Sequence, residues 1–234
     1  MRSANDERYV PALRFSWLTP AYDTVVAATT RERRFKQALM MQARLAAGQR
    51  VLDLACGTGT LALWIKQRHP DLEVNGIDGD TKILEIAGRK AMKAGVSIEF
   101  EHGLSDRMPY ADASFDRVLS SLFFHHLSWQ QKERTAREIH RVLRPGAELH
   151  VADWGRASGP VMRGAFLAIQ LLDGFSNTRD NVDGRLVALF QAAGFAEVSQ
   201  QQSFATVFGT LALYRAVRPS RSASASPLDE QDPF

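Results

Sequence analysis

The chain has 234 residues, a length that fits one domain with a sizeable core. Its 45% hydrophobic and 24% charged residues are ordinary for a globular protein, and the net charge of +3 is too small to indicate a nucleic-acid partner. A single cysteine, Cys56, excludes an intramolecular disulfide and a cysteine-based metal cluster, so it is expected to be a small buried filler.

No early apolar segment resembles a signal peptide, and no apolar run reaches the roughly 18 residues of a membrane span. We therefore expect a cytoplasmic protein without stable membrane insertion. Residues 218–234 are rich in serine, alanine and charge, which predicts a disordered tail.

Residues 1–30 are apolar and aromatic after a polar start, but they show little periodicity. Tyr9, Trp17 and Tyr22 stand here among prolines. We expect an N-terminal flap that covers the core, or a lid over a substrate pocket, because aromatic side chains combine apolar contact area with a polar tip. The two interpretations are compatible.

Helical and strand patterns alternate from residue 31 to residue 217. A first helix is expected over residues 31–47, and Asp80, Ser128 and Asp183 have the positions of helix N-caps. The strands are expected at residues 51–54, 72–78, 97–102, 116–121, 147–153, 195–204 and 209–217. Five alternations of strand and helix predict right-handed crossovers and a parallel sheet covered on both faces. The last two strands are joined so closely that they must be antiparallel.

The segment Val51–Thr60 combines a short apolar strand, a Gly57-x-Gly59 turn and the start of a helical pattern. Glycines let a ligand approach the backbone, and a helix start offers N–H groups without partners in the helix. This corner is typical of nucleotide-binding sites. It also partly matches the dinucleotide fingerprint, which is weak evidence by itself.

Two acids narrow the ligand class. Asp53 lies four residues before Gly57, where a carboxylate suits the cationic methionine end of S-adenosylmethionine and would repel a pyrophosphate. Asp78 ends the second strand, where its two oxygens are able to accept both ribose hydroxyls, although NAD would require the same acid. A closing antiparallel hairpin is not part of a plain dinucleotide domain, and it also favours S-adenosylmethionine.

Five motifs in order resemble class I S-adenosylmethionine-dependent methyltransferases: VLDLACGTGT, GIDGD, MPYADASFDRVLSS, HRVLRPGAELHVADW and FGTLALYRA. The chain is most similar to the ubiquinone/menaquinone-biosynthesis C-methyltransferases, from about Phe15, through Tyr22 and Asp23, to Val217. The resemblance implies an α/β fold with a Rossmann-like seven-stranded sheet, mostly parallel with an antiparallel last strand. It also implies S-adenosyl-L-methionine as cofactor and methyl transfer to a small, largely apolar molecule.

The resemblance also assigns cofactor-binding residues. The methionine-binding turn matches Asp53, Gly57, Thr58 and Gly59. Asp78 matches the ribose acid, Gly79 begins the adenine edge, and Ser121 at the end of the fourth strand corresponds to a position beside the transferred methyl.

The adenine side departs from the pattern of the relatives. Leu104 and Ser105 stand where relatives often have Asp-Ala or Asn-Ala, whose polar side chain meets the adenine amino group. Leu104 cannot supply that contact. Adenine recognition is therefore expected to depend on backbone groups or on Asp106.

Two histidines, His125 and His126, follow the fourth strand at the sheet edge where ligands of open α/β sheets bind. One of them is a candidate general base for a hydroxyl, a thiol or a carbon acid. Alternatively, one packs in the core and the other caps the following loop. We expect no metal site, because no further carboxylate or histidine has a suitable spacing.

The substrate pocket is expected between the flap, the histidine loop and an insertion at residues 155–183 that belongs to the domain of residues 31–217. Its predicted lining is Tyr9, Trp17, Tyr22, Phe124, Trp154 and Phe166. The apolar insertion is alternatively plain core or a dimer contact, so a homo-oligomer is possible.

Other functions stay open at this point. A nucleic-acid methyltransferase typically has an Asn/Asp-Pro-Pro-aromatic loop after strand four, which Ser121–Phe124 lacks, and no aromatic-basic stripe is evident. A protein that binds S-adenosylmethionine without catalysis and a dinucleotide oxidoreductase are further alternatives. The sequence does not determine whether carbon, oxygen, nitrogen or sulfur accepts the methyl group.

Overall fold

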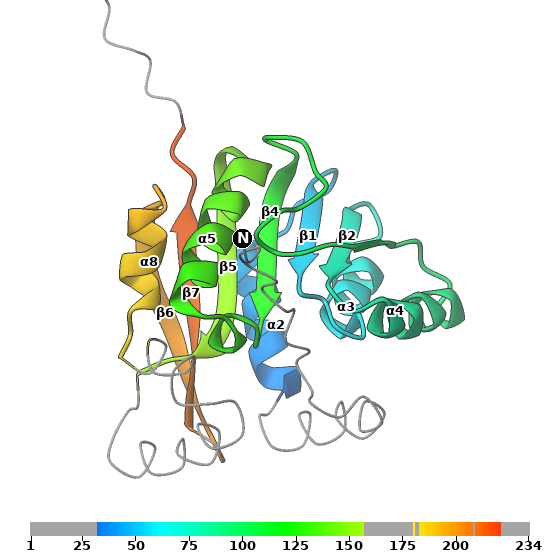
Figure 1. Ribbon diagram of the computed structural model, residues 1–234. Coiled ribbons are helices and arrows are strands. Elements are labelled where there is room, and N and C mark those ends of the chain that lie inside the picture. The colour runs from blue at the N-terminus through cyan, green and yellow to red at the C-terminus, as the bar shows by residue number, and fades with distance from the viewer. Residues whose placement is uncertain (1–31, 157–179, 181–182, 208, 221–234) are drawn as a thin grey trace, which may run out of the picture.

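The computed structural model of the chain describes residues 32–156, 180, 183–207 and 209–220. These residues form one seven-stranded sheet with the strand order β3-β2-β1-β4-β5-β7-β6 (Figure 1). The strands are β1 (Arg50–Leu54), β2 (Glu73–Asp78), β3 (Glu99–His102), β4 (Phe115–Ser121), β5 (Leu143–Trp154), β6 (Ala196–Thr206) and β7 (Gly209–Val217).

The strand directions confirm the expected sheet. The pairs β1–β2, β1–β4, β2–β3 and β4–β5 are parallel, whereas β7 runs antiparallel to both β5 and β6. The chain order reverses between β1 and β4, because β2 and β3 lie on one side of β1 and the later strands lie on the other. Open α/β sheets bind ligands at such a reversal, beside the carboxyl ends of the strands.

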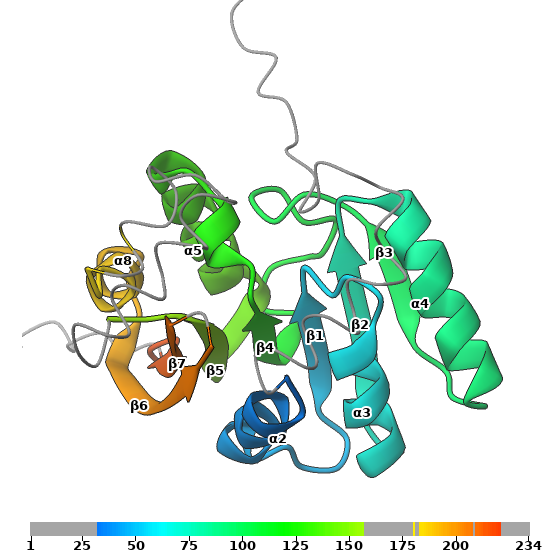
Figure 2. The same cartoon turned by 90° about the horizontal axis from the view of Figure 1, so that it is seen from below.

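Helices cover both faces of the sheet (Figure 2). On one face, α2 (Glu32–Ala43) and α3 (Thr60–Arg68) bury their apolar residues, and α4 (Thr81–Lys93) packs beside α3 over β2 and β3. On the other face lie α5 (Trp129–Val142) and α8 (Leu186–Ala192). Side chains alternate along β1, so Leu52 and Leu54 join the α5 side while Val51 joins the α2 side.

Two of the three expected helix caps are confirmed. The Asp80 carboxylate accepts hydrogen bonds from the N–H groups of Lys82 and Ile83 at the start of α4. Ser128 and Gln131 form a reciprocal capping box that begins α5. The third was wrong, because α8 begins after Arg185 rather than at Asp183 and has no side-chain cap.

Two boundaries differ from the sequence prediction by more than two residues. The first helix ends at Ala43 rather than at residue 47, because Arg44 adopts a left-handed backbone with φ of 44°. Strand β5 begins at Leu143 rather than at residue 147. The Gly146 N–H donates to the Arg218 carbonyl, so the start of this strand is bonded to the chain beyond β7.

Some predictions fall outside the described residues. These are the flap at residues 1–30, residues 157–179 of the insertion and residues 221–234 of the tail. In the described part of the chain, no helix has the length and the apolar character that crossing a bilayer requires.

Candidate functional site

The carboxyl ends of four strands meet at one edge of the sheet. Leu54 of β1 pairs with Ile77 of β2 on one side and with Ser120 of β4 on the other, and Ser121 pairs with Ala152 of β5. The predicted acids, the glycine turn and the histidine loop therefore lie along the same edge.

Asp53 is buried in β1, with 1% of its surface exposed. Its Oδ2 atom accepts a hydrogen bond of 3.0 Å from the Ala62 N–H in the first turn of α3, whereas Oδ1 is buried and has no hydrogen-bond partner among the described residues. Burial raises the pKa of Asp53 to about 7, although nearby Lys36 opposes the shift. A buried carboxylate oxygen of this kind favours a cationic or hydrogen-bond-donating ligand.

The two glycines of the turn have different surroundings. Gly57 has a φ of 54°, and a Cβ atom added to it would meet nothing within 4 Å. Gly59 has a φ of 72°, but its added Cβ would lie 2.9 Å from Ala87 Cβ and 2.9 Å from Phe100 Cζ. Gly57 therefore leaves its backbone open to a ligand, while Gly59 permits α3 to pack closely against α4 and β3.

Asp78 joins the end of β2 to this turn. Its Oδ2 atom accepts from the Gly57 N–H at 2.9 Å and its Oδ1 atom accepts from the Asp80 N–H at 3.0 Å. Burial raises the pKa of Asp78. The neighbouring Gly79 carbonyl lies 3.2 Å from His102 Nε2.

The Thr58 side chain is hydrogen-bonded to a lysine of α4. Lys90 Nζ donates to the hydroxyls of Thr58 and Thr60, at 3.0 Å each. The Thr58 side chain is thus a link between the glycine turn and α4, which the sequence did not indicate.

The residues expected at the adenine edge have separate environments. Leu104 is 41% exposed. The Ser105 hydroxyl lies 2.8 Å from the Thr135 hydroxyl of α5, and Asp106 forms an ion pair of 2.9 Å with Arg134. The polar side chains of this loop are therefore directed to α5.

A second cluster forms where η2 (Phe124–His126) follows β4. His125 Nδ1 lies 2.8 Å from Asp153 Oδ1, and both side chains are buried. Oδ1 also accepts from the Trp154 N–H at 2.7 Å, and Oδ2 accepts from the Phe123 N–H at 3.1 Å. Burial disfavours the Asp153 carboxylate, but these partners, led by His125, hold its pKa below the ordinary value.

The sequence prediction did not include Asp153. The available signal was a charged residue near the end of an apolar strand, in the sequence HVADW. Its pairing with His125 depends on β5 lying next to β4, which no local pattern establishes.

The two adjacent histidines differ. Their ring centroids are 4.0 Å apart, and the His125 ring also faces the edge of Trp154 at 6.3 Å. Burial, followed by repulsion from His125, lowers the pKa of His126 to about 3. His126 is therefore neutral at physiological pH and is a weak base.

Of the predicted pocket residues, only Phe124 and Trp154 are among the described residues. Phe124 is 0% exposed and packs against Phe190 in the core, so it does not line a pocket wall as expected. Trp154 is 3% exposed beside His125. Tyr9, Trp17, Tyr22 and Phe166 lie outside the described residues.

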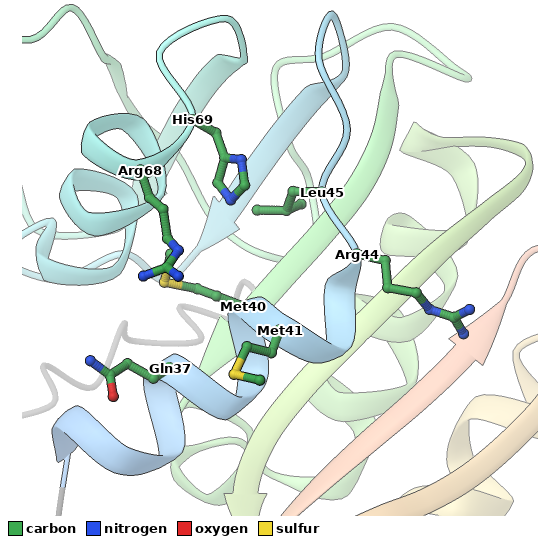
Figure 3. Close-up of a pocket in the computed structure, with 7 residues that line it drawn as sticks. All are labelled: Gln37, Met40, Met41, Arg44, Leu45, Arg68 and His69. Atoms are coloured by element: carbon green, nitrogen blue, oxygen red, sulfur yellow. The ribbon is translucent and has the colours of Figure 1, made fainter.

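A cavity of about 380 Å³ lies elsewhere, between α2 and the end of α3 (Figure 3). Met40, Met41, Arg44, Arg68 and His69 contribute to its lining. Arg68 and His69 stand at the carboxyl end of α3, whereas the predicted site adjoins its amino end. This cavity is therefore not the predicted site.

Comparisons with known proteins agree with the geometry of the edge. The family described as a methyltransferase domain matches residues 51–146. The demethylmenaquinone methyltransferase of Deinococcus radiodurans is 36% identical over 137 residues, which are 58% of this chain and 56% of the relative. That of Thermus thermophilus is 34% identical over 154 residues, which are 65% of this chain and 67% of the relative. The alignments thus span between about half and two thirds of these curated relatives.

The fold has solved counterparts as well. The crystal structure of the YcgJ protein from Bacillus subtilis matches with a TM-score of 0.67 and 19% identity, covering 80% of this chain and 99% of that chain. At this identity the likeness establishes the fold alone. The match to the Thermus relative shows that the chain belongs to the class I S-adenosylmethionine-dependent methyltransferases, in the ubiquinone/menaquinone-biosynthesis group.

Proposed function

We propose that the protein transfers a methyl group from S-adenosylmethionine to a small, largely apolar molecule. The observation that carries this proposal is the buried, unpartnered Oδ1 atom of Asp53 beside a glycine turn whose Gly57 is open to a ligand. When bound, S-adenosylmethionine supplies a methyl group already activated by its sulfonium. The chain's own residues then have to bind the reactants, align them and exclude water.

The donor set at the edge fits this cofactor. Asp53 offers its unpartnered carboxylate oxygen to the cationic amino-acid end. Each Asp78 oxygen accepts one backbone N–H and has a second acceptor position, which suits the sugar hydroxyls. Gly57 and Gly59 adopt the positive φ values of the turn that leads into α3. The hydrogen bond from Lys90 to Thr58 ties this turn to α4.

The remaining predicted contacts have smaller roles in the proposal. Gly79 and Leu104 offer a backbone and an apolar surface to the adenine, since Ser105 is engaged with Thr135. Ser121 ends β4 next to the transfer point. Of the two predicted histidines, His125 is the better candidate base, because the pKa of His126 is strongly lowered.

We also infer a small-molecule acceptor rather than a nucleic acid, because the described loop after β4 consists of Leu122, Phe123 and the buried residues of η2 instead of a base-binding motif. A homo-oligomer and a cytoplasmic location remain expectations from the sequence.

Calorimetry with S-adenosylhomocysteine and a labelled-methyl transfer assay on a panel of small aromatic acceptors test the proposal. We expect binding, followed by label in an extractable apolar product. Binding without transfer to any acceptor would favour a non-catalytic binding protein. Tight binding of a nicotinamide dinucleotide in place of S-adenosylhomocysteine would contradict the methyl-transfer assignment.

A further inference from the structure

The cavity of about 380 Å³ between α2 and the carboxyl end of α3 lies away from the edge that holds the glycine turn (Figure 3). The turn leads into the amino end of α3 at Gly59, whereas Arg68 and His69 stand at the other end. The nine residues of this helix span roughly 13 Å. The cavity is therefore separate from the residues proposed to bind S-adenosylmethionine.

One wall of the cavity is aliphatic. Met40 of α2 is buried and Leu45 is half-buried, and both belong to the cluster that packs α2 on the sheet. Met41 lies one position further around the helix, so it points away from that cluster and is 76% exposed. A methionine side chain is flexible and polarisable, and it adapts to ligands of varied shape. This wall suits an alkyl chain.

The rim of the cavity is cationic. Arg44 and Arg68 contribute to it, and none of the seven described lining residues is an aspartate or a glutamate. Neither arginine forms an ion pair within the described part of the chain. Figure 3 shows Arg68 extending from α3 toward α2, whereas Arg44 points away from the other lining residues. Arg68 is therefore the cation that faces the cavity.

Arg68 also has a purely structural interpretation. A cation in the last turn of a helix interacts favourably with the partial negative charge of that end. In the same turn, however, Lys66 Nζ donates to the carbonyls of Pro70 and Leu72, at 2.8 and 2.6 Å. Lys66 thus already supplies a cation that binds carbonyls at this end. The test must separate the two interpretations of Arg68.

We propose that this cavity binds a small amphipathic anion from solution, with its acidic head on Arg68 and an unbranched alkyl chain against Met40, Met41 and Leu45. A carboxylate matches the planar guanidinium, which donates two parallel hydrogen bonds to it. One central cation suits a single negative charge, whereas the phosphates of a nucleotide would require more. The volume lies in the range of roughly 300–1,000 Å³ that is typical of ligand pockets. This site is additional to the proposed methyl transfer and does not depend on it.

Octanoate is the probe, and ¹³C-labelled methionine methyl groups report where it binds to the full chain. The Met40 and Met41 signals should shift together in a saturable titration, because both side chains line the cavity. Met92 is the internal control, since it is 75% exposed on α4 beside the basic Lys93 but does not line the cavity. A shift of Met92 as large as that of Met41 would indicate non-specific adsorption and overturn the proposal.

Ligands of equal chain length test the charge of the head. Octan-1-ol should bind more weakly than octanoate, and octylammonium should not compete with octanoate, because Arg68 attracts only the anion. Equal affinity for all three would mean that the chain alone is recognised, which contradicts an acidic head.

Two arginine variants separate the cavity from the general positive charge of α2. Arg68→Gln should weaken octanoate binding by up to about fivefold, which is the worth of an exposed ion pair, and should leave octan-1-ol binding unchanged. Arg33→Gln is the matched control, because it removes an exposed cation of α2 that does not line the cavity. It should leave both affinities unchanged. If Arg68→Gln weakened both ligands equally, or neither, its role would be structural and the proposal would fail. Equal losses of octanoate affinity in the two variants would also overturn it.

Two further measurements identify the source and the place of the anion. Phosphatidylcholine vesicles that contain phosphatidylglycerol should leave the protein in the supernatant on sedimentation. Co-sedimentation that Arg68→Gln abolishes, without any shift from octanoate, would assign this surface to a membrane and contradict a ligand from solution. Saturating S-adenosylhomocysteine should not displace octanoate. Displacement would place the anion at the glycine turn and would contradict a separate site.

Discussion

The Asp78 carboxylate accepts a hydrogen bond of 2.9 Å from the Gly57 N–H, so the predicted ribose acid also holds the glycine turn. Asp78→Ala removes both functions, and we expect it to weaken S-adenosylhomocysteine binding by about 1–3 kcal/mol. Calorimetry measures the change. Asp80→Ala is the control, because it removes only the α4 cap, at a cost of about 1 kcal/mol in the free energy of unfolding. Equal affinity losses in both variants would contradict the assignment.

Alanine substitutions at Gly57 and Gly59 should affect ligand binding and folding stability to different extents. Alanine at either position has to adopt a left-handed backbone, which costs roughly 1–2 kcal/mol. Gly59→Ala also forces a contact of 2.9 Å with Phe100, so thermal unfolding should show the larger loss of stability there. Gly57→Ala should lose more affinity for S-adenosylhomocysteine than the strain explains. If Gly59→Ala lost more affinity for S-adenosylhomocysteine than Gly57→Ala, the ligand would not lie on the open side of Gly57.

Asp53 should make the unliganded protein less stable as the pH rises. Its folded-state pKa of about 7 lies above the ordinary value of 3.8. Its contribution to the free energy of unfolding is therefore fully present below about pH 4 and is lost as the pH rises through 7. Asp53→Asn removes this dependence. Between pH 5 and pH 8, urea unfolding should show the free energy of unfolding of the variant rising relative to that of the wild-type protein by up to about 3 kcal/mol. Parallel stability curves would exclude an Asp53 carboxylate with a raised pKa.

Glu148 should make the protein less stable as the pH falls, which is opposite to the effect of Asp53. The hydrogen bond from His150 lowers the pKa of the Glu148 carboxyl most. Burial opposes this shift, and the hydrogen bond from Arg215 adds to it, so the net pKa is lowered. Its contribution is therefore present above the ordinary carboxyl pKa of about 4.3 and is lost as the pH falls below it. Glu148→Gln should lower the free energy of unfolding at pH 7 but much less at pH 3. A deficit that is independent of pH would point to packing instead.

The sequence predicted what local patterns determine. The glycine turn, the Asp80 cap and the capping box at Ser128 depend on residues within a few positions of one another, and the structure confirms these features. The buried state of Cys56 was also expected, and burial raises its pKa. The antiparallel closing strands followed from the short connection between them.

Long-range contacts account for what the sequence analysis missed. The hydrogen bonds of Asp153 with His125 and of Lys90 with Thr58 join residues 28 or more positions apart, on neighbouring elements. Phe124 was assigned to a pocket because it adjoins the histidines, yet the short η2 turn directs it against Phe190 in the core. Ser105 stays a prediction for the adenine edge, but the bond between its hydroxyl and Thr135 of α5 was not indicated by the sequence.

A crystal structure of the full chain with S-adenosylhomocysteine tests the central claim most directly. We predict the nucleoside thioether over the Gly57 turn, its sugar hydroxyls on Asp78 and its amino group hydrogen-bonded to Asp53. A turn left empty at saturating ligand, or one that binds a pyrophosphate instead, would contradict both the methyl donor and the reaction.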